Sequence, residues 1–146
     1  GFGLRHDFPI DSKDDVAVVV AAGIMLHEAL KAYEELKKEG MLIRVIDLYS
    51  VKPVDAATLA LAADDAVAVI TVEDHYAEGG LGEAVRSALA GHPAPVHSLA
   101  VRKMPVSGKP DELLDYEEIS KDAIINVVRE IKGARKTGRT AGRKTR

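Results

Sequence analysis

The side chains best suited to chemistry lie near the middle of the chain, where Glu73, Asp74 and His75 follow an apolar run. Two carboxylates and an imidazole in one segment offer proton transfer or ligation of a hard metal ion. Their spacing argues against both, because consecutive residues of an extended segment point to opposite sides and Asp74 would face away from Glu73 and His75. No second histidine follows at the i, i+4 spacing of a helical metal site. We therefore expect a solvated loop or a subunit contact at His75, and no metal site.

A glycine-rich turn follows directly, with Gly79, Gly80 and Gly82 ahead of an expected helix. Glycines let the backbone approach another group closely, and the free N–H groups at a helix N-terminus attract anions. The spacing is neither that of the dinucleotide fingerprint nor that of a Walker loop. We favour a tight turn that allows close packing of the helix on the sheet. The alternative is an autonomous regulatory domain that binds a phosphate or nucleotide at Gly79–Gly82.

A second loop with a candidate phosphate ligand is Ser107–Pro110, in which Lys109 carries the charge. We favour a plain turn here, with Gly108 at positive φ and Pro110 as the first residue of a short helix. No serine of the chain stands in a Gly-x-Ser-x-Gly elbow. We therefore assign no catalytic residue.

Alternating strands and helices must position these residues. Apolar runs and helical periodicity predict strands at 16–21, 42–48, 66–72 and 96–101 and helices at 26–36, 56–63, 83–90 and from 120 onward. Asp55 is expected to cap the second helix, Glu28 to lie on the polar face of the first, and Gly40 and Gly133 to end the first and last. This alternation predicts an α/β fold with a mainly parallel sheet, in which ligands collect at the carboxyl ends of the strands.

Composition limits the class of protein further. A chain of 146 residues with 47% hydrophobic residues can bury one core, so we expect one main domain. The absence of cysteine excludes disulfides and thiol nucleophiles. No apolar run approaches the roughly 20 residues that span a bilayer, and the first ten residues lack the pattern of a secretory signal. We expect a cytoplasmic protein without a membrane partner.

The final segment, residues 134–146, is rich in Lys, Arg, Gly and Thr and contains no acidic residue. Such a segment cannot bury enough apolar surface to offset the entropy of ordering, so we expect a disordered basic tail. Contact with nucleic acid is a weaker alternative, because no aromatic residues alternate with the basic ones. We do not expect a nucleic-acid partner.

The chain resembles the C-terminal domain of the transketolase family, of the animal type, over about residues 14–133. The order and spacing of the matching segments are specific to the family: Leu26–Leu30, Ile43–Asp47 with Val51–Pro53, Val72–Tyr76 with Glu78–Val85, and Ser107–Pro110 with Glu112–Leu114. Similar Gly-Gly-x-Gly turns occur in deoxyxylulose phosphate synthases and in the β subunits of 2-oxoacid dehydrogenases. The Ser-Gly-Lys-Pro element favours transketolase among these.

The resemblance implies a three-layer α/β/α domain over residues 15–133, with a mostly parallel, mixed sheet of about five strands, after an interdomain linker at 1–14. It implies a domain that supports assembly and dimerisation of an enzyme of the pentose phosphate pathway, which moves a two-carbon ketol unit between sugar phosphates. Thiamine diphosphate and Mg²⁺ or Ca²⁺ would bind to preceding domains of that homodimer, so no catalytic, cofactor or metal residue is assigned to this chain. The candidate anion or interface loop comprises Glu73, Asp74, His75, Gly79, Gly80, Gly82 and Lys109.

Overall fold

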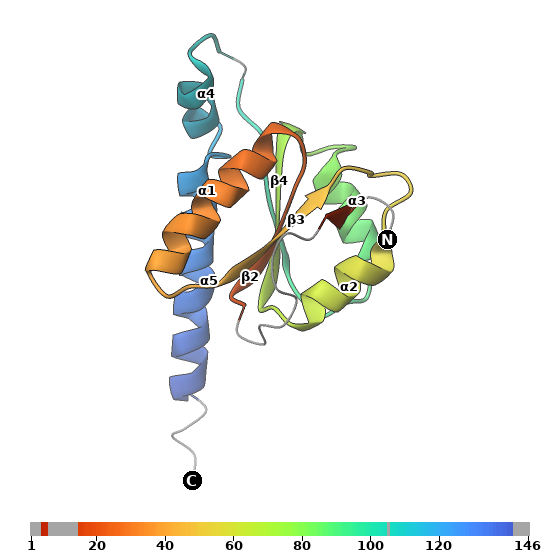
Figure 1. Ribbon diagram of the computed structural model, residues 1–146, viewed down its shortest axis with the longest axis vertical. Coiled ribbons are helices and arrows are strands. Elements are labelled where there is room, and N and C mark those ends of the chain that lie inside the picture. Colours follow the sequence, from red (N-terminus) through yellow and green to blue (C-terminus); the bar gives the residue numbers. More distant parts are fainter. Residues whose placement is uncertain (1–3, 6–14, 105, 142–146) are drawn as a thin grey trace.

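The computed structural model describes residues 4–5, 15–104 and 106–141 (Figure 1). The strands are β1 (Leu4–Arg5), β2 (Ala17–Ala21), β3 (Ile43–Leu48), β4 (Ala68–Tyr76) and β5 (Val96–Val101). The helices are α1 (Ile24–Lys38), α2 (Ala56–Asp64), α3 (Leu81–Ala88), α4 (Pro110–Tyr116) and α5 (Lys121–Ala141). No helix in these ranges is long and apolar enough to cross a membrane.

The strands form one sheet in the order β1-β3-β2-β4-β5. The strands β2, β3, β4 and β5 are parallel to their neighbours, and β1 pairs antiparallel with β3. The mostly parallel, mixed sheet of about five strands is therefore confirmed. The edge strand β1 lies within the segment expected to be a linker, because its residues Leu4 and Arg5 pair with Leu48 and Asp47.

Helices cover both faces of the sheet, with α1 and α5 on one side and α2 and α3 on the other (Figure 1). The central strand β2 shows why its sequence is continuously apolar. Val19 packs in the core beneath α1 and α5, while Val18 and Val20 pack in the core beneath α2 and α3. Burying such a side chain stabilises the fold by about 1.5–3 kcal/mol, so both faces of β2 contribute to stability.

Two expected helix ends are confirmed. Gly40 takes φ +68° after α1. Its N–H donates to the Lys37 carbonyl at 3.1 Å and the Met41 N–H donates to the Leu36 carbonyl at 2.9 Å, which is a Schellman motif. At the start of α2, the Asp55 carboxylate accepts a hydrogen bond from the Thr58 N–H at 3.0 Å.

The strand expected to end at residue 72 continues to Tyr76. Its extension follows from tertiary pairing, because Tyr76 still pairs with Val101 of β5 beyond an irregularity in the register. Glu73, Asp74 and His75 therefore lie in a strand, and their expected placement in a loop is wrong. Helix α3 begins at Leu81, ahead of the predicted start at residue 83.

Two expected roles of glycine residues are wrong. Gly108 does not adopt a positive φ, although Pro110 begins α4 as expected. Gly133 does not end the last helix, since α5 continues to Ala141. One glycine in a helix costs only about 1 kcal/mol relative to alanine, and good helix formers surround this one. Residues 134–141 of the expected disordered tail are thus helical, and residues 142–146 lie outside the described residues.

Candidate functional site

The glycine-rich turn at the carboxyl end of β4 encloses an anion that belongs to the same chain. The Glu73 carboxylate accepts hydrogen bonds from the backbone N–H of Leu81 at 2.6 Å and of Gly82 at 3.0 Å. Glu73 is only 5% exposed. Its negative charge lies where the dipole of α3 and the free N–H groups of its first turn favour an anion. An external phosphate would have to displace this carboxylate.

The positions of the glycines follow from the position of Glu73. A Cβ atom added to Gly80 would lie 1.9 Å from Glu73 Oε2, and one added to Gly82 would lie 2.9 Å from Glu73 Oε1 and 2.9 Å from Ser98 Oγ. No larger residue fits at either position without displacing its neighbours. Gly79 differs, because it has open space but a φ of +71°. The glycines therefore allow α3 to pack closely on the sheet.

The other residues of the candidate loop do not join Glu73 in a catalytic arrangement. Asp74 and His75 are exposed at the end of β4, and His75 Nδ1 lies 2.9 Å from the Tyr76 carbonyl oxygen. Lys109 lies at the start of α4, where its backbone N–H donates to Glu112 at 3.3 Å. The described residues contain no group of three or more His, Cys, Asp or Glu side chains that could hold a metal ion.

A second buried glutamate, Glu28 on α1, binds the N-terminus of α5. Its carboxylate accepts a hydrogen bond from the Lys121 N–H at 2.8 Å and pairs with Lys31 Nζ at 2.7 Å. The expectation that Glu28 lies on the solvent face is wrong, because α5 packs against α1 (Figure 1) and the side chain of Glu28 is buried. Helical periodicity could have indicated that Glu28 is buried, since it lies on the same face of α1 as the buried Met25 and Ala32.

The Glu28 carboxylate lies at a polar recess of about 220 Å³ between α1, α4 and the start of α5. The hydrogen bond from Lys31 to Glu28, and then the attraction between their charges, raises the pKa of Lys31. Hydrogen bonds to Glu35 and Asp122 raise the pKa of Lys121. Both lysines of the recess, Lys31 and Lys121, are therefore already paired with carboxylates.

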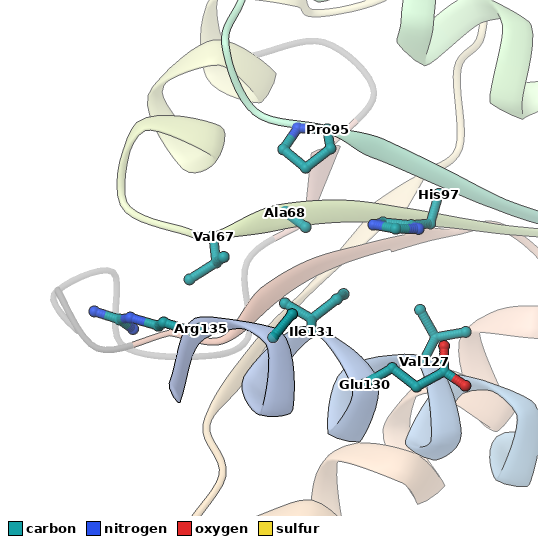
Figure 2. A pocket seen from close by; sticks show the side chains of 9 residues that line it. Val67, Ala68, Pro95, His97, Val127, Glu130, Ile131 and Arg135 are labelled. Carbon is teal, nitrogen blue, oxygen red and sulfur yellow. The ribbon is translucent and has the colours of Figure 1, made fainter. Parts of the chain in front are cut away.

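A larger recess of about 310 Å³ lies where α5 crosses the starts of β4 and β5. Val127 and Ile131 of α5 face the strands, and His97 and Arg135 stand at opposite ends of the recess (Figure 2). Its lining is otherwise mainly apolar. Its lining residues do not combine a nucleophile, a base and an electrophilic group, so we assign the recess no catalytic role.

The family model described as "Transketolase, C-terminal domain" matches residues 7–124. The chain is 52% identical over 125 residues to a transketolase of Pongo abelii and 51% identical over 125 residues to one of Homo sapiens. It is 52% identical over 122 residues to a transketolase-like protein 1 of Bos taurus. Each match covers 82% of this chain and 20% of the relative, so the chain spans about one fifth of their length.

Solved structures agree with these sequence matches. A structure entitled "Split gene transketolase, inactive beta4 tetramer" has a TM-score of 0.75 and 34% identity, covering 81% of this chain and 39% of that chain. A transketolase of Campylobacter jejuni has a TM-score of 0.62 over 88% of this chain and 18% of that chain, and its 19% identity supports the fold alone. The chain belongs to the transketolase C-terminal domain family.

Proposed function

We propose that this chain is the C-terminal assembly domain of a transketolase, an enzyme that transfers a two-carbon ketol unit between sugar phosphates. The observation that carries the proposal is the pair of hydrogen bonds from Leu81 and Gly82 to Glu73. The feature of this domain that most resembles a phosphate site is occupied by the chain's own carboxylate. The domain then contributes surface and stability rather than a site for the reacting groups.

The proposal places thiamine diphosphate and its Mg²⁺ or Ca²⁺ in the preceding domains of the enzyme. The described residues of this chain do not fit that cofactor, because they contain no cluster of three metal ligands and the Leu81 and Gly82 N–H groups of α3 bind Glu73. A diphosphate with its metal needs both kinds of partner. No catalytic step is therefore assigned to a residue of this chain.

The proposed partners are the preceding domains and a second copy of the whole enzyme. Two observations support them: the relatives are about five times longer than the matched region, and one related structure is a tetramer of a split-gene transketolase. The similarity to transketolases also supports the proposal that the enzyme acts in the cytoplasm, in the pentose phosphate pathway.

Complementation tests the proposal. Human transketolase cut before its C-terminal domain is mixed with this chain, and ketol transfer is measured with and without thiamine diphosphate and Mg²⁺. We expect this chain to restore cofactor-dependent activity to the truncated enzyme, since it is 51% identical to the human protein over 125 residues. The proposal is wrong if the separately supplied human domain restores activity and this chain does not.

A further inference from the structure

Exposed large apolar side chains gather at one edge of the sheet. Among the described residues, the strand ends at the carboxyl edge, and the loops and the start of α1 that follow them, expose Ile24, Tyr49, Val51, Tyr76, Met104 and Val106, which we call the carboxyl-end patch. Met104 is 80% exposed and Tyr49 is 63% exposed. Three other exposed large apolar residues lie elsewhere. Leu42, which is 38% exposed, precedes β3 at the amino ends of the parallel strands, and Leu61 and Tyr116 lie on α2 and α4.

The topology brings the patch together from four separate segments. Ile24 follows β2, Tyr49 follows β3, Tyr76 ends β4 and Met104 follows β5. Because these four strands are parallel, their carboxyl ends meet at the same edge of the sheet. Exposed large apolar side chains that share one end of a sheet favour a site of interaction there.

The direction of β1 indicates what covers this edge in a longer transketolase. Because β1 is antiparallel to β3 and Leu4 pairs with Leu48, the amino end of β1 points toward the carboxyl ends of the parallel strands. Figure 1 shows β1 beside the arrowhead of β3. In a transketolase in which this domain follows the rest of the enzyme, a polypeptide that leads into β1 would therefore enter at the carboxyl ends of the parallel strands.

We propose that the carboxyl-end patch is the surface on which the preceding, cofactor-binding part of a transketolase packs. This inference rests on the proposed function and adds the site of contact to it. The exposed Asp74 and His75 at the end of β4 supply polar groups at the margin of the patch. Protein interfaces commonly combine an apolar centre with such a polar rim.

A binding experiment tests the patch. Human transketolase cut before its C-terminal domain is immobilised, and binding of the wild-type chain is compared with that of the double variant Tyr49→Ser, Met104→Ser. We expect the double variant to bind at least about tenfold more weakly, because large side chains at an interface centre carry most of the binding energy. The control is Leu61→Ser on α2, a position that is 68% exposed and outside the patch, and it should bind within about twofold of wild type.

The outcomes separate the two proposals once circular dichroism shows that all variants are folded. If the wild-type chain does not bind, the proposed function fails. If the wild-type chain and both variants bind alike, or Leu61→Ser alone weakens binding, the patch is not the contact surface. If light scattering shows wild-type dimers that the double variant does not form, and the truncated enzyme does not compete with them, the occupant is a second copy and the inference is overturned.

Discussion

The N-termini of α3 and α5 both bind a carboxylate, but in different surroundings. Each binds a glutamate carboxylate of the same chain, Glu73 at Leu81 and Gly82 and Glu28 at Lys121. At α3, the carboxylate rises from the strand beneath and is enclosed by the turn. At α5, it approaches from a neighbouring helix and lies at a polar recess of about 220 Å³.

The difference explains why only one of the two ends is rich in glycine. The turn before α3 lies directly over Glu73, so a Cβ atom at Gly80 would overlap its carboxylate. Glu28 reaches α5 from the side, and the first turn of α5 contains no glycine. A glycine-rich turn at the end of a strand therefore indicates close approach to an anion, and that anion can belong to the protein itself.

Removal of the enclosed carboxylate should have the largest effect. Glu73→Ala leaves the Leu81 and Gly82 N–H groups buried without an acceptor, and each such group costs about 1–3 kcal/mol. We expect a loss of about 3–4 kcal/mol in the free energy of unfolding, measured by urea denaturation. The control is Glu83→Ala in the same turn, where the exposed carboxylate accepts from Gly79 at 2.9 Å. Equal losses for the two variants would show that the enclosed position of Glu73 is unimportant.

Addition of one methyl group at the same turn should have the next largest effect. In Gly82→Ala, the Cβ would lie within 3.0 Å of side-chain atoms of Glu73, Ser98 and Thr71. Forcing an extra group into packed surroundings costs about 1–3 kcal/mol. Thermal unfolding by calorimetry measures the loss, with Gly133→Ala as control, since that position has open space and lies within α5. An unfolding midpoint at or above that of wild type would contradict the packing at Gly82.

Removal of the other carboxylate should cost less. Glu28→Ala removes the acceptor of the Lys121 N–H, but the recess lets water replace it, so we expect about 1–2 kcal/mol. Glu28→Gln keeps an acceptor oxygen and should retain most of the stability. Urea denaturation of both variants beside Glu73→Ala tests the comparison directly. A larger loss of stability at Glu28 than at Glu73 would contradict the expectation that the carboxylate at α3 contributes more to stability than the one at α5.

We expect the smallest effect at the exposed ion pair between Glu39, which follows α1, and Arg129 of α5. Arg129 Nη2 lies 2.6 Å from Glu39 Oε1, and this hydrogen bond lowers the pKa of Glu39. A lowered pKa means that the pair stabilises the fold above the ordinary pKa of glutamate, and that this contribution is lost as pH falls through the lowered value. An NMR titration of the Glu39 carboxyl should show its pKa rise in Arg129→Ala. An unchanged pKa would mean that the pair does not form in solution.

Local signals predicted most of the architecture. The continuous apolar run of β2, the capping carboxylate of Asp55 and the C-terminal position of Gly40 each carry their information within a few residues. The roles of Glu28 and Glu73 could not be predicted from local sequence, because they depend on tertiary packing and their partners lie on other elements. The sequence placed Glu73 beside the correct turn, but neither composition nor spacing showed that it fills the anion position itself.

The most direct test of the assembly-domain account is thermal unfolding of the isolated chain with thiamine diphosphate, Mg²⁺ and a sugar phosphate, separately and together. A ligand that binds only the folded state adds about 2.7 kcal/mol of stability at 100 times its Kd. Because Glu73 already occupies the Leu81 and Gly82 N–H donors of α3, the account predicts an unchanged midpoint with every addition. A midpoint that rises and saturates with any of these phosphates would show that the domain has a binding site of its own, and would contradict the account.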